Sequence, residues 1–314
     1  MKILITGGAG FIGSHLAKKL INAGHIIYIA DNLSTGLLSN VPPRVEFIKC
    51  DLSNEVNIAK LPRSIDVIYH LASQASGQVS CEMPSEDLKV NTYATLLLLQ
   101  WAKRNSIKKF IFTSTMGVYQ DLAGFPVAET SAMVPKSFYG INKLASEAYI
   151  RIFAEEGMRS TIFRLFNVYG PGQNMDNLKQ GMVSIYMHYV LRKTPIKVLG
   201  PLTRIRDFVF IDDVIDALLL GLDGRSDGGV FNVCTGQPTS VSDVLNLILS
   251  AFDLPKDYPV NVGARTPRDI DEIWGDYSLI QDVLGWNPNN SLSIGIGKMA
   301  DWLKKEGCHD LSSM

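Results

Sequence analysis

The sequence predicts an α/β fold in which a doubly wound parallel sheet is followed by a smaller C-terminal lobe. Over the first two-thirds of the 314-residue chain, short β-branched runs alternate with longer helical patterns. This rhythm changes after Asn167, where turn residues and scattered prolines become frequent. Strands that alternate with helices are typical of a parallel sheet that is covered by helices on both faces.

The expected elements follow from these patterns in chain order. Strands are predicted at Lys2–Thr6, His25–Ala30, Val45–Lys49, Val67–His70, Lys109–Thr113, Thr161–Leu165 and Val230–Val233. Helices are predicted at Phe11–Ala23, Asn54–Leu61, Asp87–Arg104, Tyr139–Glu156 and Leu178–Arg192, and a further one from Asp212 after the run Arg206–Phe210. Crossovers in such sheets are right-handed, which limits the topologies that the chain can adopt.

A second lobe is expected from the later part of the chain. The segment Tyr169–Asn174 is a loop by its glycine and proline content, and Pro238, Pro255, Pro259, Pro267 and Pro288 interrupt the pattern further on. The sheet domain is therefore expected to comprise residues 1–168 and 205–234. The lobe is expected to comprise residues 169–204 and 235–314.

Composition excludes several classes of function. A net charge of −1 leaves no basic surplus for a nucleic-acid partner, and no apolar run is long enough to span a membrane. The cysteines lack the paired spacings of a metal or redox site, so reduced thiols are expected at Cys50, Cys81, Cys234 and Cys308. For the same reason, no metal ion is expected. Because the N-terminus has no signal-peptide core, we expect a cytoplasmic protein.

A glycine turn follows the first expected strand. It places Gly7, Gly10 and Gly13 between that strand and the first expected helix. In dinucleotide-binding Rossmann units, the first glycine permits a tight turn, the second lets the backbone approach a pyrophosphate and the third allows close helix–strand packing. The N–H groups of the helix N-terminus then face the phosphates. The context of the turn therefore predicts a dinucleotide site.

Asp31 indicates which dinucleotide is bound. It follows Gly13 by 18 residues, at the end of the second expected strand. A carboxylate at this place accepts hydrogen bonds from the ribose hydroxyls and repels a 2′-phosphate, which favours NAD over NADP. A role of Asp31 as a turn or helix cap is the alternative.

Tyr139 and Lys143 lie four residues apart on an expected helix, and therefore on one face of it. A nearby ammonium stabilises a phenolate and lowers the pKa of the tyrosine, so Tyr139 is predicted to be a general base. The hydroxyls of Thr113, Ser114 and Thr115 come at the carboxyl end of a strand, where ligands of parallel sheets bind. They are candidates to contact a substrate oxygen, with strand-end capping as the alternative.

Taken together, the motifs resemble the extended short-chain dehydrogenase/reductase family, in particular its nucleotide-sugar epimerases and dehydratases. The resemblance covers nearly the whole chain. It rests on Gly7–Gly13, Asp31–Gly36, Asp51–Leu52, His70–Ser73, Asn91, Thr113–Tyr119, Tyr139–Lys143, Arg164–Pro171, Arg206–Phe208, Asp212–Asp213 and Leu284–Pro288.

The resemblance implies where NAD and a nucleotide-sugar would bind. Cofactor contacts are implied for Gly7, Gly10, Phe11, Ile12, Gly13, Asp31, Asn32, Ser34, Thr35, Gly36, Asp51, Leu52, Leu71, Ala72, Ser73, Asn91, Thr113, Tyr139, Lys143 and Phe166. Substrate contacts are implied for Thr115, Tyr139, Asn167, Arg206 and Arg268. The implied catalytic residues are Thr115, Tyr139 as the base, and Lys143, which would hold the nicotinamide ribose.

Some of these positions also have simpler interpretations. His70 and Phe166 could be core residues, Asn91 could satisfy backbone groups in its helix, and Arg206 could form a surface ion pair with Asp207.

Two departures from the family pattern stand out. Where the family commonly has Arg-Pro-Gly-Asp near a diphosphate, this chain reads Arg265-Thr266-Pro267-Arg268-Asp269, so the phosphate contact could come from Arg265 or from Arg268. Gln120 stands where the family's epimerases usually carry glycine.

The residues after Thr115 separate the reactions of the family. Its 4,6-dehydratases resemble Thr-Asp-Glu here, its decarboxylating members resemble Thr-Ser-Glu, and its epimerising reductases tend to carry a cysteine. This chain has Met116 and Gly117, neither of which can transfer a proton. The resemblance therefore implies oxidation and re-reduction at one carbon, which is the reaction of a 4-epimerase acting on a UDP-hexose. A nucleotide-sugar 4-ketoreductase and a non-catalytic NAD-binding regulator are the alternatives.

A homodimer is also expected. Leu96–Leu99 and Trp101 make one expected helix apolar on all sides, and Leu144, Ala148 and Ile152 lie on the next long one. Pairing these helices across a two-fold axis would bury the surplus in a four-helix bundle, with Leu97 or Trp101 facing outward.

Overall fold

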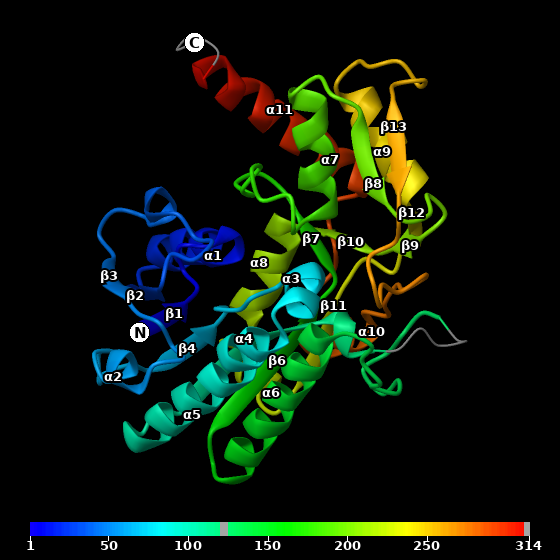
Figure 1. The fold of residues 1–314 in the computed structure, drawn as a ribbon. Coiled ribbons are helices and arrows are strands. Elements are labelled where there is room, and N and C mark those ends of the chain that lie inside the picture. The colour runs from blue at the N-terminus through cyan, green and yellow to red at the C-terminus, as the bar shows by residue number, and fades with distance from the viewer. Residues whose placement is uncertain (120–124, 311–314) are drawn as a thin grey trace.

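The computed structural model describes residues 1–119 and 125–310, with side chains as far as residue 305. Gln120 and the side chain of Cys308 lie outside the described part. The chain forms a sheet-bearing part and, above it in Figure 1, a smaller part built from later residues.

The main sheet has seven parallel strands in the order β11-β6-β5-β4-β1-β2-β3. They are β1 (Lys2–Thr6), β2 (Ile26–Asp31), β3 (Glu46–Lys49), β4 (Val67–His70), β5 (Lys109–Thr115), β6 (Arg159–Leu165) and β11 (Val230–Val233). This arrangement confirms the predicted doubly wound parallel sheet. The strand order reverses between β1 and β4, and ligands of such sheets bind beyond the carboxyl ends of the strands at that reversal.

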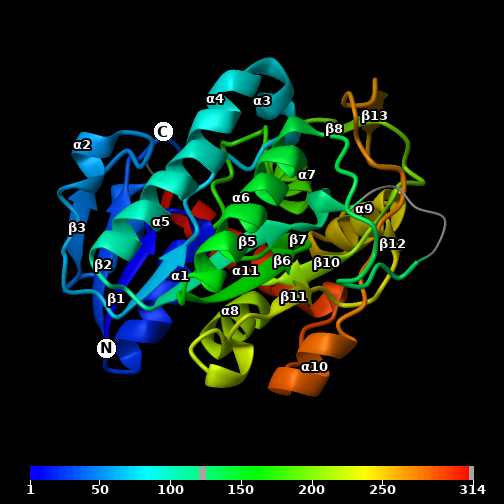
Figure 2. The same ribbon diagram turned by 90° about the horizontal axis from the view of Figure 1, so that it is seen from below.

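Helices cover both faces of the sheet (Figure 2). Those around the sheet are α1 (Phe11–Asn22), α2 (Glu55–Ile58), α3 (Gly77–Glu82), α4 (Pro84–Leu88), α5 (Ala94–Arg104), α6 (Phe138–Glu155), α8 (Ile211–Leu220) and α10 (Ser278–Leu284). A π-helical turn, η2 (Lys89–Tyr93), joins α4 to α5, and 3-10 turns occur at Leu38–Asn40, Met116–Val118 and Gly224–Ser226. No helix among the described residues is long and apolar enough to cross a membrane.

Two apolar cores follow from the alternation along the strands. Ile3 and Ile5 of β1 pack with Leu16 of α1 and Leu218 of α8 on one face. Leu4 packs on the other face in the core that contains the apolar residues of α5. Because every second side chain of a strand points to the opposite face, a sheet buried on both sides needs such continuous apolar runs.

The smaller part contains three two-stranded pairings and three helices. β7 (Asn167–Tyr169) pairs with β10 (Phe208–Phe210), β8 (Ile196–Leu199) with β13 (Val260–Gly263), and β9 (Ile205–Arg206) with β12 (Thr239–Ser240). The helices are α7 (Met182–Leu191), α9 (Val241–Ala251) and α11 (Leu292–Asp310). In Figure 1, α7 and α9 lie beside the β8–β13 pair, away from the main sheet, and α11 packs against α9.

Several predicted boundaries differ from the structure for identifiable reasons. β5 continues to Thr115 because its pairing with β6 extends to Thr115 opposite Leu165. The helix predicted from Asp87 begins at Pro84 and is interrupted by η2. The helix predicted from Leu178 begins at Met182, after Gly181 with a φ of 90°. The run Arg206–Phe210 is divided between β9 and β10, which belong to different sheets.

Gly13 is a packing requirement of the first strand–helix connection. A Cβ atom added at Gly13 would lie 2.3 Å from the Gly7 carbonyl oxygen and 2.7 Å from the Gly8 Cα. A Cβ added at Gly10 would meet only the Gly7 oxygen, at 3.2 Å. The two glycines therefore differ in what they do for the fold.

Replacing Gly13 with alanine should lower the free energy of unfolding by about 1–3 kcal/mol, because the added methyl group overlaps backbone atoms. Gly10→Ala is the matched control and should lose clearly less. Urea unfolding without added nucleotide measures both. Equal losses in the two variants would contradict the packing role of Gly13.

Candidate active site

The candidate site lies where the strand order reverses, at the carboxyl ends of β1, β4 and β5. The glycine turn leaves β1, the segment Leu71–Ser76 leaves β4, and Thr115 ends β5. The N-terminal turn of α6 adds Tyr139. The sequence-predicted residues thus come together from four segments that are far apart along the chain.

The glycine turn has the shape needed for a phosphate cradle. Gly7 has a φ of 71°, and a Cβ there would lie 2.6 Å from the Ala72 nitrogen. Gly10 is the N-cap of α1 and faces little protein, so its backbone is open to a ligand. Phe11 and Ile12 form the first turn of α1 and are half-buried. The residues present fit a dinucleotide pyrophosphate, and their contacts with it stay predictions.

Asp31 ends β2 and joins it to the glycine turn. Its carboxylate accepts hydrogen bonds from the Ala9 nitrogen at 3.0 Å and from the Leu33 nitrogen at 2.8 Å. The predicted capping role is therefore real. Because each carboxylate oxygen has a second lone pair, Asp31 can also accept ribose hydroxyls.

The segment after Asp31 folds back onto the glycine turn. Asn32 accepts a hydrogen bond from the Ser34 nitrogen at 3.0 Å, and after Thr35 a Cβ at Gly36 would lie 2.9 Å from the Ala9 carbonyl carbon. This places the Asn32–Gly36 segment beside the expected ribose site.

Asp51 and Leu52 follow β3. The Asp51 carboxylate accepts the nitrogen and the hydroxyl of Ser53, at 2.9 and 2.7 Å, and Leu52 is buried in the core. Asp51 is thus a turn-forming residue, and its contact with adenine is still a prediction.

The segment after β4 is tied to the π-helical turn by Asn91. Leu71 and Ala72 run beside Thr6 of β1, whose carbonyl and hydroxyl accept their nitrogens. The Asn91 Oδ1 accepts the Ser73 hydroxyl at 2.7 Å and the Gln74 nitrogen at 3.1 Å. Asn91 therefore satisfies backbone groups, as the simpler interpretation had it, but those groups belong to the site segment rather than to its own helix.

The first turn of α6 seats directly on the end of β5. Ser137 caps α6 by accepting the Gly140 nitrogen at 3.0 Å. A Cβ at Gly140 would lie 2.2 Å from the Gly117 oxygen, so no larger residue permits this approach. As a result Tyr139 lies within hydrogen-bonding reach of the side chains of Thr115 and Ser73.

Lys143 is buried one turn beyond Tyr139. Only 2% of it is exposed, and its Nζ lies 4.1 Å from the centroid of the Phe112 ring. Burial lowers the pKa of Lys143 to about 7, while the carboxylates of Glu147 and Asp87 act in the opposite direction. The predicted Tyr139–Lys143 helix face is present, and it points into the molecule.

The pKa of Tyr139 is raised in this structure, whereas the sequence predicted that Lys143 would lower it. Burial raises the pKa of Tyr139 to about 12, and hydrogen bonds from Thr115 and Ser73 only partly oppose it. A nearby ammonium lowers the pKa of a tyrosine, but the cost of burying a phenolate raises it, and spacing along the sequence does not reveal that cost. In this state Tyr139 is a neutral phenol at neutral pH.

His70 is a core residue. Its Nδ1 lies 2.7 Å from the Thr6 hydroxyl and its Nε2 lies 2.9 Å from the Thr95 hydroxyl. Burial, followed by the charge of Lys143, lowers the pKa of His70 to about 3. The ring is therefore neutral and adds no charge to the site.

A buried ion pair fixes α6 against β5 and β6. Glu147 accepts the Arg164 Nε at 3.0 Å and Nη2 at 2.7 Å, and it also accepts the Ser114 hydroxyl at 2.5 Å. Both Glu147 and Arg164 are almost fully buried. The sequence analysis missed Glu147, although its spacing of four from Lys143 places it on the same helix face.

Phe166, Thr113 and Asn167 line the approach to the strand ends. Phe166 is buried in the core, and the Thr113 hydroxyl donates to the His70 carbonyl at 3.4 Å. The Asn167 amide donates to the Asp207 carbonyl at 2.8 Å and to the Met116 sulfur at 3.6 Å. Their predicted contacts with cofactor or substrate are untested by this geometry.

Arg206 belongs to a buried arginine cluster, and the surface ion pair with Asp207 is wrong. Its Nη2 donates to Asp269 at 2.7 Å, and Arg204 is bound to the other oxygen of the same carboxylate. Asp207 instead accepts the Thr235 hydroxyl and backbone nitrogens. Arg204 and Asp269 had not been predicted, because the pair joins segments 65 residues apart.

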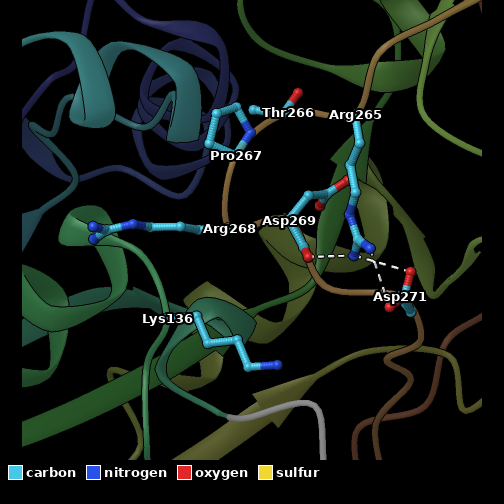
Figure 3. A pocket seen from close by; sticks show the side chains of 7 residues that line it. All are labelled: Lys136, Arg265, Thr266, Pro267, Arg268, Asp269 and Asp271. Atoms are coloured by element: carbon cyan, nitrogen blue, oxygen red, sulfur yellow. Dashed lines mark hydrogen bonds and ion pairs between the residues drawn. The ribbon is translucent and has the colours of Figure 1, made fainter.

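The segment after β13 forms one wall of a cavity of about 370 Å³. Figure 3 shows Arg265 turned toward Asp271 and Arg268 extending sideways, away from both. Arg265 bonds Asp271 at 2.9 Å, whereas the Arg268 guanidinium lies 4.6 Å from the centroid of the Phe138 ring. Arg268 has a φ of 64°, and its contact places it next to the turn that carries Tyr139.

Comparisons with known proteins agree with this geometry. The UDP-glucose 4-epimerase of Mycolicibacterium smegmatis is 32% identical over 317 residues, covering 98% of this chain and 99% of that protein. A crystal structure of UDP-glucose 4-epimerase from Thermotoga maritima with UDP-glucose has a TM-score of 0.92 and 35% identity, covering 98% of this chain and 99% of that one.

A second structure, UDP-glucose 4-epimerase from Thermus thermophilus in complex with NAD, has a TM-score of 0.89 and 31% identity, covering 97% of this chain and 99% of that one. The family model of NAD dependent epimerases and dehydratases matches residues 3–234, which include the glycine turn, Thr115, Tyr139 and Lys143. The chain therefore belongs to the NAD dependent epimerase/dehydratase family.

Proposed function

We propose that this protein is an NAD-dependent nucleotide-sugar 4-epimerase whose substrate is a UDP-hexose. One observation carries the proposal: the Tyr139 hydroxyl lies beside Thr115 and Ser73, one turn from Lys143, at the strand ends near the glycine turn. The names of the similar proteins support the UDP-sugar and the 4-position.

The chemistry at the end of β5 favours proton and hydride transfer at a single carbon. Thr115 is followed by Met116 and Gly117 in the 3-10 turn that α6 packs upon. Elimination of water or loss of carbon dioxide would need an acid or a base placed here. A thioether and a glycine supply neither, so the 4-hydroxyl is the group on which these residues act.

Each residue then has a definite task. The Tyr139 oxygen, once ionised, accepts the proton of the substrate 4-hydroxyl and later returns it. The Thr115 hydroxyl, which accepts the Gly117 nitrogen at 3.1 Å, still has its proton to donate to the same substrate oxygen. Lys143 provides positive charge beside the phenolate. NAD, when bound, supplies the hydride acceptor and a positive charge that also favours the phenolate.

The substrate diphosphate is proposed to bind at the arginine-rich wall. Arg265 and Arg268 line the cavity, and Arg206 is joined to its wall through Asp269. Arg206 already makes bonds to Asp269 and to three backbone oxygens, whereas the Arg268 guanidinium lies over the Phe138 ring. This distribution supports Arg268 or Arg265 as the direct phosphate contact and Arg206 as the anchor of the wall.

Two alternative functions, a 4-ketoreductase and a non-catalytic regulator, would need different features of the site. A 4-ketoreductase would consume one reduced cofactor per turnover, and Asp31 argues against NADP as that reductant. A non-catalytic regulator would have no use for the Tyr139–Lys143 arrangement. The division into residues 1–168 with 205–234 and residues 169–204 with 235–314, and the cytoplasmic location, remain proposals.

The direct experiment is to incubate the protein with UDP-, GDP-, CDP- and dTDP-hexoses and to follow inversion at C4 by NMR. Inversion of a UDP-hexose with catalytic NAD supports the proposal. Product formed only in proportion to added reduced cofactor would support the ketoreductase instead.

We also propose a homodimer formed by α5 and α6, but through side chains other than those expected. Leu97 and Trp101 are each only 5% exposed, so both face the chain's own core, and their predicted outward position is wrong. Ile141 and Ile152 are 46% and 53% exposed. With Ala145 and Ala148 between them on the same face of α6, they form an apolar stripe on which small residues permit close helix packing.

A second copy is the proposed occupant because the exposed stripe is apolar and charges of both signs border it. The hollow beside Ile152 is bordered by Lys103 and Arg104 of α5 and by Glu156 just after α6. A two-fold axis brings each patch against itself, so both signs of charge can be matched.

Tyr139→Phe should fold normally, keep NAD and lose turnover by about 10²–10⁴-fold, because the proton acceptor is gone. Tyr149→Phe, on the same helix, is the control and should retain activity. Steady-state epimerase assays with a fluorescence titration of NAD measure both properties. Near wild-type turnover of Tyr139→Phe would remove this hydroxyl from the mechanism.

Asp31→Ala should weaken NAD binding by roughly 10- to 100-fold, since hydrogen bonds to a charged group contribute about 1.5–3 kcal/mol. It should also reduce the preference for NAD over NADP. Asp31→Asn keeps the shape of the side chain and should relax the preference with a smaller loss of NAD affinity. Unchanged affinities for both cofactors would show that Asp31 serves only the backbone of the turn.

Light scattering of the wild-type protein should give twice the 34.6 kDa of one chain. Ile152→Glu should shift the mass toward one chain, because it places charge on the apolar stripe. Leu279→Glu, at another exposed apolar residue on α10, is the control and should remain dimeric. A wild-type protein that is monomeric at micromolar concentration would contradict the dimer.

A further inference from the structure

Asp87 is a buried carboxylate next to the reaction site that the mechanism above does not use. It lies on α4 and is 1% exposed. Its Oδ1 accepts the Gln74 Nε2 at 2.7 Å and the Asn91 Nδ2 at 3.0 Å, and its Oδ2 accepts the Asn142 Nδ2 at 2.6 Å. These donors are neutral amides, so the hydrogen bonds leave the negative charge of Asp87 uncancelled.

The three amides connect Asp87 to three of the segments around Tyr139. Gln74 belongs to the segment after β4, Asn91 to the π-helical turn and Asn142 to α6, between Tyr139 and Lys143. Asn91 passes the connection on, because its Oδ1 accepts the Ser73 hydroxyl at 2.7 Å. Ser73 in turn lies beside Tyr139. A π-turn inside a helix is often found at a functional site.

Asp87 also acts on charge. Lys143 of α6 is subject to the charges of Asp87 on α4 and of Glu147 on its own helix. The neutral His70 of β4 and the ring of Phe112 on β5 also lie near Lys143. Glu147 is held by Arg164 through two hydrogen bonds and by Arg151 at 3.2 Å. Glu147 and Asp87 both act on the ammonium of Lys143, but Glu147 is also paired with guanidinium groups, whereas the amide partners of Asp87 are neutral.

We propose that Asp87 is a positioning residue of the epimerisation: it holds the Ser73–Gln74 segment against Tyr139 through Asn91 and serves as the buried counter-charge of Lys143. The inference rests on the proposed function for its catalytic meaning. It goes beyond that function by assigning a role to a residue that touches neither the cofactor nor the reacting atoms.

The two roles predict a shift in pH dependence with a definite sign. The negative charge of Asp87 raises the pKa of Lys143 and raises the pKa of Tyr139. Removing the charge therefore lets Lys143 lose its proton at lower pH and lets Tyr139 ionise at lower pH. Both limbs of the bell-shaped kcat profile should move toward acid, by on the order of 1 pH unit for a nearby charge.

The test compares three variants of the full-length chain. Asp87→Asn keeps the shape of the side chain and removes the charge. Glu86→Gln removes the same charge from the neighbouring, exposed position and is the control. The double variant Asp87→Asn with Asn142→Asp returns a carboxylate to the other side of the same 2.6 Å hydrogen bond.

We expect both limbs to shift toward acid in Asp87→Asn, to stay in place in Glu86→Gln and to return toward the wild-type position in the double variant. At a pH above the alkaline limb, a 1-unit shift is an about tenfold loss of turnover. A uniform loss at all pH values, with both limbs unmoved, would show that Asp87 is only structural and would overturn the proposal.

A second readout does not depend on turnover. In protein labelled with ¹³C at lysine Cε, the Lys143 resonance is the one that disappears in Lys143→Arg, and its titration should move toward acid in Asp87→Asn. An unmoved titration would overturn the charge role even if the double variant failed to fold. If the wild-type protein inverts no nucleotide-sugar, the proposed function fails, while this titration still tests the Asp87–Lys143 pair.

Discussion

The contact between the first turn of α6 and the end of β5 is the constraint on which the site depends. Gly140 lies against the Gly117 carbonyl so closely that a Cβ would come within 2.2 Å of it. The buried Glu147–Arg164 pair, with the Ser114 hydroxyl, holds the same helix two turns further on. Together they fix both the distance and the rotation of α6, and so place Tyr139 beside Thr115 and Lys143 over Phe112.

This arrangement has an electrostatic cost that shapes the chemistry. Lys143 and Tyr139 are withdrawn from water, which lowers the pKa of the first to about 7 and raises that of the second to about 12. Burial thus disfavours the charged pair that proton transfer requires. The buried carboxylates offset part of this for Lys143, and a cationic cofactor ring offsets part for Tyr139. A bound cationic cofactor would therefore make the proposed base easier to ionise.

The fold and the place of the candidate residues at the strand ends could largely be predicted because they depend on local patterns. Alternating strands and helices, the spacing of Gly7, Gly10 and Gly13, and the four-residue step from Tyr139 to Lys143 are all visible within short windows. The direction in which the pKa of Tyr139 shifts could not be predicted, since it depends on burial, and the spacing of residues does not reveal burial. The outward position of Leu97 and Trp101 failed for the same reason: an all-apolar helix does not show which side its own chain covers.

The residues that sequence reasoning missed come from long-range contacts. Asp87 meets Asn142 across 55 positions, and Arg204 meets Asp269 across 65. No periodicity links such pairs, so only the folded chain brings them together. Glu147 was within reach, because its helical spacing from Lys143 already placed it on the buried face.

The central claim is that one carbon is oxidised and then reduced again, with Tyr139 moving only the hydroxyl proton. The most direct measurement uses a UDP-hexose that carries deuterium on C4, incubated with the protein and catalytic NAD in ordinary water. The account predicts that the 4-epimer forms with the deuterium still on C4, because the hydride that leaves this carbon is the one that returns. Loss of the deuterium to solvent during inversion would contradict it.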